Sequence, residues 1–188
     1  TITAAAQENG IDPLLLTAVI YQESRFNAGA VSHTGVRGLM QITENTARHL
    51  GIDRNDPHQS IEGGARYLRE MYDKLEKYDL SEWDRWFLTL AAYNQGPGHL
   101  SDAMRLARKL GTEGRTWLEV KEAFPLLSYE KYYSQARNGY CRGREAVGYV
   151  DNVRYFYYIL HGLVVLSRPE SEHLASLLGI IPKSWPGI

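Results

Sequence analysis

The feature that most constrains the fold is helical periodicity, which runs through almost the whole chain. Apolar residues recur three and four positions apart in many segments, as at Ile61, Ala65, Leu68, Tyr72 and Leu75, and this spacing is typical of one face of an α-helix. No segment alternates convincingly between apolar and polar residues, and no internal repeat is present. A chain of 188 residues can bury a core without disulfides or metals. The sequence therefore predicts an all-α globular domain.

Start and stop signals predict where the helices lie. Asp12-Pro13 predicts a helix start, because Asp caps free amides and Pro suits the first turn; this helix should end between Glu23 and Phe26, before a loop of small residues over 27–38. A short helix is predicted from Thr43 to Leu50, and Ser60 is predicted to cap the helix that follows. Another is predicted from Ser81 to the break at Gly96-Pro97-Gly98. The remaining helices are predicted over about 100–110, 117–124 and 145–166. We expect residues 1–167 to form the domain and 168–188 a tail with one short helix packed on it.

Composition argues against several classes of function. With a formal net charge of −1, the chain has no strong positive electrostatic field that would attract nucleic acid. Cys141 is the one cysteine, so it forms no internal disulfide and is expected to be an inert thiol rather than a nucleophile, although Arg142 and Arg144 flank it. Six scattered His residues predict no metal site, and neither a phosphate loop nor a cofactor motif is present. The most apolar stretch, 147–166, contains charges and is predicted to be a buried helix rather than a membrane span.

Glu23 is the candidate for proton chemistry. Cleaving a glycosidic bond requires an acid that protonates the leaving oxygen, and a carboxyl group does this well when a dry pocket raises its pKa. Glu23 ends an apolar helix, and the partial negative charge at a helix C-terminus disfavours ionisation of a carboxyl nearby. We therefore hypothesise that the helix end helps to hold Glu23 protonated.

Several motifs occur in an order that identifies a family. Glu23-Ser24 is followed by Ser32, and the later motifs are Gly38-Leu39-Met40-Gln41-Ile42, Ala92-Tyr93-Asn94-Gln95-Gly96 and Gly148-Tyr149-Val150. This set resembles the catalytic domain of the soluble lytic transglycosylases over about residues 11–160. The resemblance implies a helical, lysozyme-like fold of the goose type with an active-site groove.

Other segments narrow the resemblance to a subgroup. Residues 34–38, 59–68, 126–133 and 145–152 are similar to the membrane-bound lytic murein transglycosylase F subgroup, although Gln41 stands where that subgroup often has Met. In the subgroup, the catalytic module follows a domain similar to periplasmic solute-binding proteins. The chain starts at Thr1 without a leader, and we expect it to be a piece of a longer protein that lacks this domain. The resemblance implies a location in the periplasm, at the outer membrane.

The resemblance also implies roles for individual residues. Glu23 matches the catalytic glutamate, which protonates the glycosidic oxygen between N-acetylmuramic acid and N-acetylglucosamine and then takes the proton of the muramoyl C6 hydroxyl, giving a 1,6-anhydro product without water. The sugar's acetamido oxygen replaces a second carboxylate. Ser32 is expected to orient Glu23. The other expected substrate contacts are Gln41, Tyr93, Asn94, Glu145 and Tyr149, and Asn94 is also a candidate turn cap.

Three other functions stay open at this point. A muramidase that uses water would need a second carboxylate about 5–9 Å from Glu23. A glycan-binding module would keep the groove without activity. A generic helical interaction domain would make the motif order a coincidence.

Overall fold

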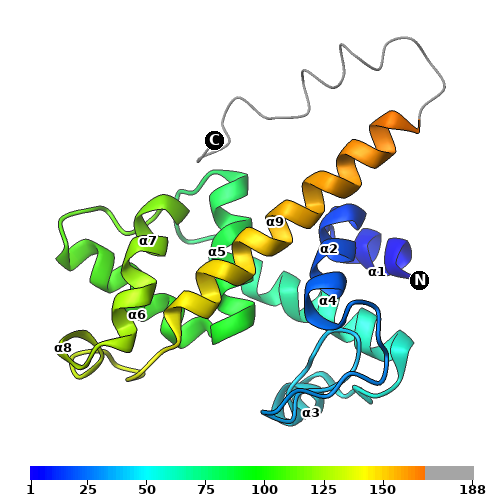
Figure 1. The fold of residues 1–188 in the computed structure, drawn as a ribbon, viewed down its shortest axis with the longest axis horizontal. Coiled ribbons are helices and arrows are strands. Elements are labelled where there is room, and N and C mark those ends of the chain that lie inside the picture. Colours follow the sequence, from blue (N-terminus) through cyan, green and yellow to red (C-terminus); the bar gives the residue numbers. More distant parts are fainter. Residues whose placement is uncertain (168–188) are drawn as a thin grey trace. The chain divides into compact units, whose positions relative to one another are not determined.

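The computed structural model describes residues 1–167, and this part of the chain is built from helices (Figure 1). In chain order the elements are α1 (Ile2–Glu8), α2 (Pro13–Ser24), α3 (Glu44–Leu50), α4 (Pro57–Asp73), α5 (Glu82–Gln95), α6 (Pro97–Lys109), α7 (Trp117–Ala123), the 3₁₀ turn η1 (Phe124–Ser128), α8 (Glu130–Tyr133) and α9 (Gly143–Leu166). Within residues 1–167 the β pairing consists of isolated bridges that join Arg37 to Val31 and to Ile42. The prediction of an all-α fold is confirmed. The predicted tail, 168–188, lies outside the described residues.

The chain divides into two compact units. Unit 1 contains Thr1–Arg69 and the stretch that begins at Asn152, and unit 2 contains Glu70–Asp151. Helices α4 and α9 each contribute residues to both units.

Unit 1 is organised around α2, whose start the sequence predicted correctly. The Asp12 Oδ1 atom accepts a hydrogen bond from the Leu14 amide at 2.7 Å, and Pro13 occupies the first turn. The second carboxylate oxygen accepts from the Tyr157 hydroxyl of α9 at 2.9 Å, so one aspartate both caps α2 and ties it to a distant segment. Leu16 and Ile20 of α2 are fully buried.

Two adjacent glycines let α4 pack closely in unit 1. A Cβ at Gly63 would lie 2.4 Å from Ile52 Cδ1, and one at Gly64 would lie 2.6 Å from the Met40 side chain. Glycine in a helix costs about 1 kcal/mol relative to alanine, and close packing accounts for that cost here. Met40 and Ile42, which flank Gln41 in the motif, are both buried.

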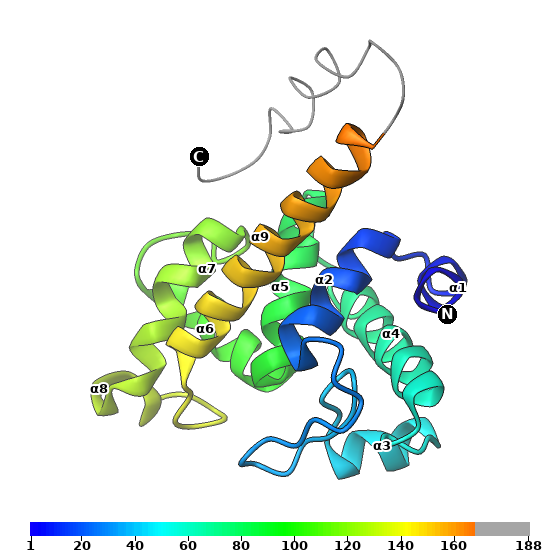
Figure 2. The same ribbon diagram turned by 45° about the vertical axis from the view of Figure 1, so that its right-hand side comes forward.

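Unit 2 contains α5, α6, α7, η1 and α8. Helices α6 and α7 run beside each other in both ribbon views (Figures 1 and 2). Asp84, in the first turn of α5, accepts from the Trp117 amide at 2.8 Å, and Trp117 is fully buried. This contact joins the starts of α5 and α7.

Some predicted boundaries were wrong. Ser60 does not cap α4: the helix starts at Pro57, and the Asp56 carboxylate accepts from the Gln59 amide at 2.8 Å, while Ser60 is buried inside the helix. Helix α6 starts at Pro97 rather than near Leu100, because a proline that breaks one helix is also well suited to the first turn of the next.

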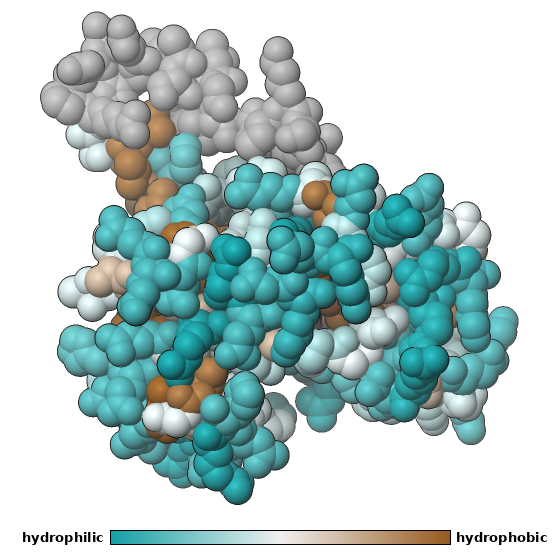
Figure 3. All heavy atoms as spheres, turned by 180° about the vertical axis from the view of Figure 1, so that it is seen from behind, coloured by the Kyte–Doolittle hydropathy of each residue, from teal (hydrophilic) through white to brown (hydrophobic). Residues whose placement is uncertain are grey.

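The last turns of α9 differ from the predicted buried helix. Leu163 and Leu166 are 58% and 63% exposed, since apolar residues surround the helix rather than forming one stripe. Seen from behind, the described surface is mostly hydrophilic, and hydrophobic residues gather at this end of α9 (Figure 3).

Candidate active site

Glu23 is the next-to-last residue of α2, and its side chain is half-buried. The helix ends at Ser24, inside the predicted interval, and its C-cap residue Arg25 has left-handed backbone angles of φ 51° and ψ 39°. Behind Glu23, the Ser24 hydroxyl is buried and donates to the Ile20 carbonyl at 3.2 Å. The carboxyl group is therefore carried by a rigid, well-packed helix end.

Backbone strain is concentrated at the motif residues. Within residues 1–167, the non-glycine residues with positive φ are Arg25, Phe26 and Gln41. Each such residue costs about 1–3 kcal/mol and persists only where the surrounding structure enforces it. Two of them directly follow Glu23 and its neighbour Ser24, and the third is the predicted groove glutamine. This coincidence supports a functional role for this part of unit 1.

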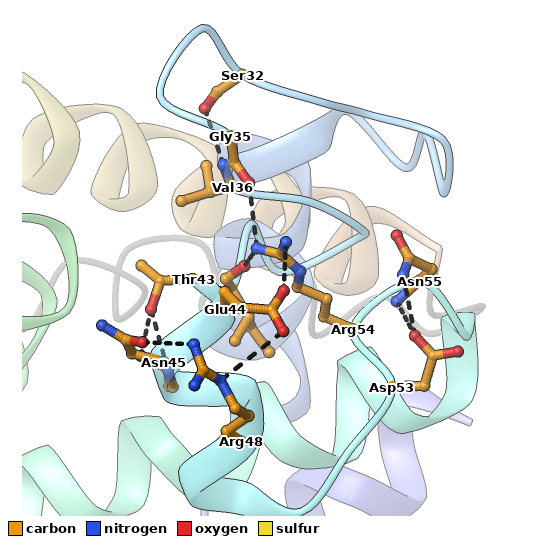
Figure 4. Close-up of polar contacts among 12 residues, drawn as sticks. Ser32, Gly35, Val36, Thr43, Glu44, Asn45, Arg48, Asp53, Arg54 and Asn55 are labelled. Atoms are coloured by element: carbon orange, nitrogen blue, oxygen red, sulfur yellow. Dashed lines mark hydrogen bonds and ion pairs between the residues drawn. The ribbon is translucent and has the colours of Figure 1, made fainter.

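The loop after α2 is organised by Ser32 (Figure 4). Its hydroxyl oxygen accepts from the amides of Thr34 at 3.2 Å and Val36 at 3.3 Å, and it lies 2.8 Å from the Thr34 hydroxyl. These bonds fold the loop on itself. They show Ser32 as a loop organiser, and its expected contact with Glu23 stays a prediction.

Arg54 anchors the same loop, a role of which the sequence contains no local signal (Figure 4). Its guanidinium donates to the carbonyls of Gly35 at 3.1 Å and Ile42 at 3.0 Å, and it pairs with Glu44 at 2.7 Å. The Arg54 side chain is only 13% exposed. One guanidinium thus joins three points of the chain, as its fixed fork of donors allows.

Gln41 lies at the end of this loop and is half-buried. Its side-chain amide donates to the carbonyls of Gly38 at 2.9 Å and Ala30 at 3.2 Å. The Met40 amide donates to the buried Ser60 hydroxyl at 3.3 Å. The Gln41 side-chain nitrogen therefore stabilises the loop. Among residues 1–167 no donor engages its side-chain carbonyl oxygen, which is the atom suited to accept from a sugar.

Gly38 is the position in this loop where a side chain is least tolerated. Its φ is +78°, and a Cβ would lie 2.0 Å from the Arg54 carbonyl oxygen. We expect Gly38→Ala to lower the free energy of unfolding by about 2–4 kcal/mol, because left-handed strain and overpacking add together. Urea unfolding measures this change. Gly35→Ala is the matched control, since Gly35 also has positive φ but faces open space; an equal loss in both variants would refute the packing argument.

The second set of predicted residues lies in unit 2, at the end of α5. Tyr93 and Asn94 are half-buried in its last turn. The Asn94 side-chain oxygen accepts from the side-chain amide of Gln95 at 2.8 Å. Helix α5 then ends at Gly96, with φ 92°, and Pro97 starts α6. The motif therefore forms a helix-to-helix corner, as the predicted break implied.

Glu145 and Tyr149 lie on α9 within unit 2 and differ in environment. Glu145 is exposed and lies 3.4 Å from Arg142 in an i,i+3 ion pair. Tyr149 is 5% exposed. Glu145 is therefore available to solvent, whereas Tyr149 is part of the packed interior and presents little surface to a ligand.

Cys141 is buried, as expected of an inert thiol, and lies 3.5 Å from the Gln95 side-chain oxygen. Burial, with the negative charges of Asp102 and Glu145, raises its pKa to about 11, the opposite of the lowering that the neighbouring arginines suggested. We expect native Cys141 to react with a disulfide reagent at pH 8 at least about 10²-fold more slowly than the unfolded chain, because the thiolate is the reactive form. Absorbance assays compare the two rates, and equal rates would contradict the burial.

Metal sites and membrane-spanning helices are both absent from the described part of the chain. No group of three or more His, Cys, Asp or Glu side chains in residues 1–167 is arranged to hold a metal ion. In the same range, no helix combines the length and apolar character required to cross a bilayer.

Comparisons with known proteins agree with the motif order. Residues 1–115 match the sequence model of the transglycosylase SLT domain, a range that includes the motifs from Glu23 to Gly96 but not Glu145 or Tyr149. The chain is 46% identical over 187 residues to membrane-bound lytic murein transglycosylase F 1 of Alkalilimnicola ehrlichii and 50% identical over 178 residues to the F enzyme of Cellvibrio japonicus. These matches cover 97% and 94% of this chain. The chain spans only 38% and 35% of the length of these relatives.

Solved structures show the fold. The lytic transglycosylase Slt of Pseudomonas aeruginosa matches with a TM-score of 0.63 and 24% identity, over 90% of this chain and 24% of that one. The 70 kDa soluble lytic transglycosylase of Escherichia coli matches with a TM-score of 0.58 and 23% identity, over 84% of this chain and 23% of that one. The predicted lysozyme-like helical fold is thereby confirmed. With most of its length matched by the domain model, the chain belongs to the transglycosylase SLT domain family.

Proposed function

We propose that this chain is the catalytic module of a peptidoglycan lytic transglycosylase. The observation that carries the proposal is the half-buried, strained end of α2, where Glu23 lies. Glu23 is the residue that we expect to serve as the family's catalytic glutamate. The names of the F relatives support murein as the substrate. The family match favours this reading over a generic interaction domain.

Glu23 would take part in two proton transfers, giving a proton in the first and taking a different one in the second. Its carboxyl group protonates the glycosidic oxygen, and the bond between that oxygen and C1 of N-acetylmuramic acid breaks. The acetamido oxygen of the same sugar stabilises the cationic carbon. The Glu23 carboxylate then removes the proton of the C6 hydroxyl as its oxygen bonds to C1. The product is a 1,6-anhydro sugar, no water is consumed, and Glu23 ends protonated, as it began.

Other motif residues would support this chemistry. The ordered loop that Ser32, Gln41 and Arg54 stabilise keeps the segment after α2 in one conformation, which lowers the cost of binding a sugar. Tyr93 and Asn94 are suited to sugar hydroxyls, because aromatic rings stack on sugars and amides hydrogen-bond to them. The same role for Tyr149 and Glu145 rests on the family resemblance alone.

We also propose a location in the cell envelope. The relatives are named membrane-bound murein enzymes, and murein lies in the periplasmic space of bacteria with two membranes. Association with the outer membrane, and a solute-binding-like domain before this module, are further parts of the proposal.

Product analysis tests the proposed function. Purified peptidoglycan is incubated with the chain, and the released fragments are analysed by mass spectrometry. We expect muropeptides that end in 1,6-anhydromuramic acid. Fragments heavier by one water would identify a hydrolytic muramidase and contradict the proposed chemistry. Binding to peptidoglycan without release of fragments would instead identify a glycan-binding module.

A further inference from the structure

Unit 2 contains a pocket that none of the predicted site residues lines. Its volume is about 280 Å³, and it lies among α6, η1 and α8. Leu106 and Leu127 are buried in its lining, and Tyr132 is half-buried. The polar lining residues are Asp102, Arg105, Lys109, Lys131 and Gln135. The pocket therefore combines an apolar floor with a polar, mostly cationic rim.

The charge of the lining is positive after internal pairing. Asp102 is buried, and its carboxylate accepts from Arg105, the Arg137 amide, and the amide and side chain of Asn138. Its negative charge is therefore already engaged by the protein. Among residues 1–167, no carboxylate is recorded within ion-pair distance of Lys109 or Lys131.

Stabilisation of a helix end accounts for the position of only one of these two lysines. Lys109 lies in the last turn of α6, where a cation is favoured by the helix dipole. Lys131 comes from a different element, α8, and lines the same pocket, with its ammonium group 5.4 Å from the Tyr132 ring centre. Two lysines from separate elements lining one partly apolar pocket are suited to a ligand that carries carboxylates on a short apolar chain.

We infer that this pocket binds the carboxylate-bearing peptide stem of the peptidoglycan strand. The identity of the ligand rests on the proposed function, because the stem is the anionic part of that substrate. Helix α6 connects the pocket to the predicted sugar contacts of the same unit, since it starts directly after Asn94, Gln95 and Gly96.

The length of helix α6 agrees with the length of a peptide stem. From Pro97 to Arg105 the helix rises about 12 Å, and to Lys109 about 18 Å, at 1.5 Å per residue. An extended stem of about five residues spans up to roughly 17 Å. A stem whose sugar lies at the Tyr93–Gly96 corner therefore reaches Arg105, and its end approaches Lys109.

Binding is tested without turnover, by NMR titration of the chain with the free stem tripeptide, L-alanyl-γ-D-glutamyl-diaminopimelic acid. We expect the amide signals of residues 102–110 and 131–136 to shift. The double variant Lys109→Gln/Lys131→Gln should bind about 2- to 30-fold more weakly, as the loss of two exposed charge pairs would give. Arg108→Gln/Lys121→Gln removes the same charge outside the pocket lining and should leave the affinity unchanged.

A second ligand tests the same charge contacts on the unaltered chain, so the result does not depend on whether a variant folds. The same tripeptide with its carboxylates converted to amides should bind the unaltered chain more weakly by a similar factor. The inference is overturned if the tripeptide shifts no signal of the pocket, or if its affinity is unaffected by both the double variant and the amidation. The titration measures binding and not activity. A chain that proves inactive or hydrolytic would therefore overturn the proposed function without affecting the measured affinity.

Discussion

The Glu23→Gln variant should lose transglycosylase activity while keeping its fold. A neutral amide has the shape of the carboxyl group but neither donates an acidic proton nor accepts one, and each proton transfer by a positioned acid or base contributes about 10²- to 10⁴-fold to the rate. Glu23 performs both transfers in the proposed mechanism. We therefore expect the release of soluble muropeptides, followed by chromatography, to fall by at least about 10³-fold.

A matched variant separates chemistry from general charge effects. Glu8 is exposed at the end of α1 in the same unit, so Glu8→Gln removes the same charge from the surface and should retain full activity. Glu8→Gln should keep the melting temperature of the unaltered chain within about 2 °C, because a surface change of this kind alters stability by at most about 0.5 kcal/mol. Thermal unfolding of Glu23→Gln checks that this variant is folded at the assay temperature. Comparable activity of Glu23→Gln and Glu8→Gln would exclude Glu23 as the catalytic acid.

The Asp102→Ala variant should cause the largest loss of stability. Asp102 is 2% exposed, and its carboxylate joins α6 to the segment after α8 through Arg137 and Asn138. Removing it leaves those donors and Arg105 without their acceptor inside the protein. Breaking a buried ion pair in this way costs about 3–5 kcal/mol, so we expect the melting temperature to fall by about 10 °C.

Differential scanning calorimetry measures this change against a surface aspartate. Asp79 is exposed in the same unit, and Asp79→Ala should leave the melting temperature within about 2 °C of the unaltered chain. A similar small effect for Asp102→Ala would show that the buried carboxylate adds nothing to stability.

The same carboxylate gives stability a defined dependence on pH. Burial alone would raise the pKa of Asp102, but the hydrogen bonds from Asn138 and Arg137, together with Arg105, hold the pKa below its ordinary value of 3.8. A carboxyl group whose pKa is lower in the folded state stabilises the fold above its unfolded pKa and loses that contribution as the pH falls through the folded pKa. The contribution of Asp102 should thus be complete above about pH 4 and decline below it.

The sequence predicted the helical fold well, because periodicity and caps are local signals. Asp12 with Pro13 marks the start of α2, and Thr43 and Leu50 mark the start and the end of α3, as predicted. Ser60 misled the prediction, since its hydroxyl bonds to the Met40 amide, twenty residues away. A serine that serves a distant loop has the same local sequence as one that caps a helix.

The candidate site was predictable only through the order of its motifs. Glu23 is a common residue at a helix end, and Ser32 and Gln41 gain significance only from their order after it in a known family. The structure adds what holds these residues in place, above all Arg54 and the buried Ser60. Such long-range contacts have no local signature, so a single sequence does not reveal them.

The central claim is most directly tested by digesting purified peptidoglycan with this chain in water enriched in ¹⁸O. A transglycosylase closes the sugar with its own C6 hydroxyl, so the account predicts anhydro products without the heavy isotope. Incorporation of one ¹⁸O atom at each new muramic acid end would mean that water is the nucleophile, and would contradict it.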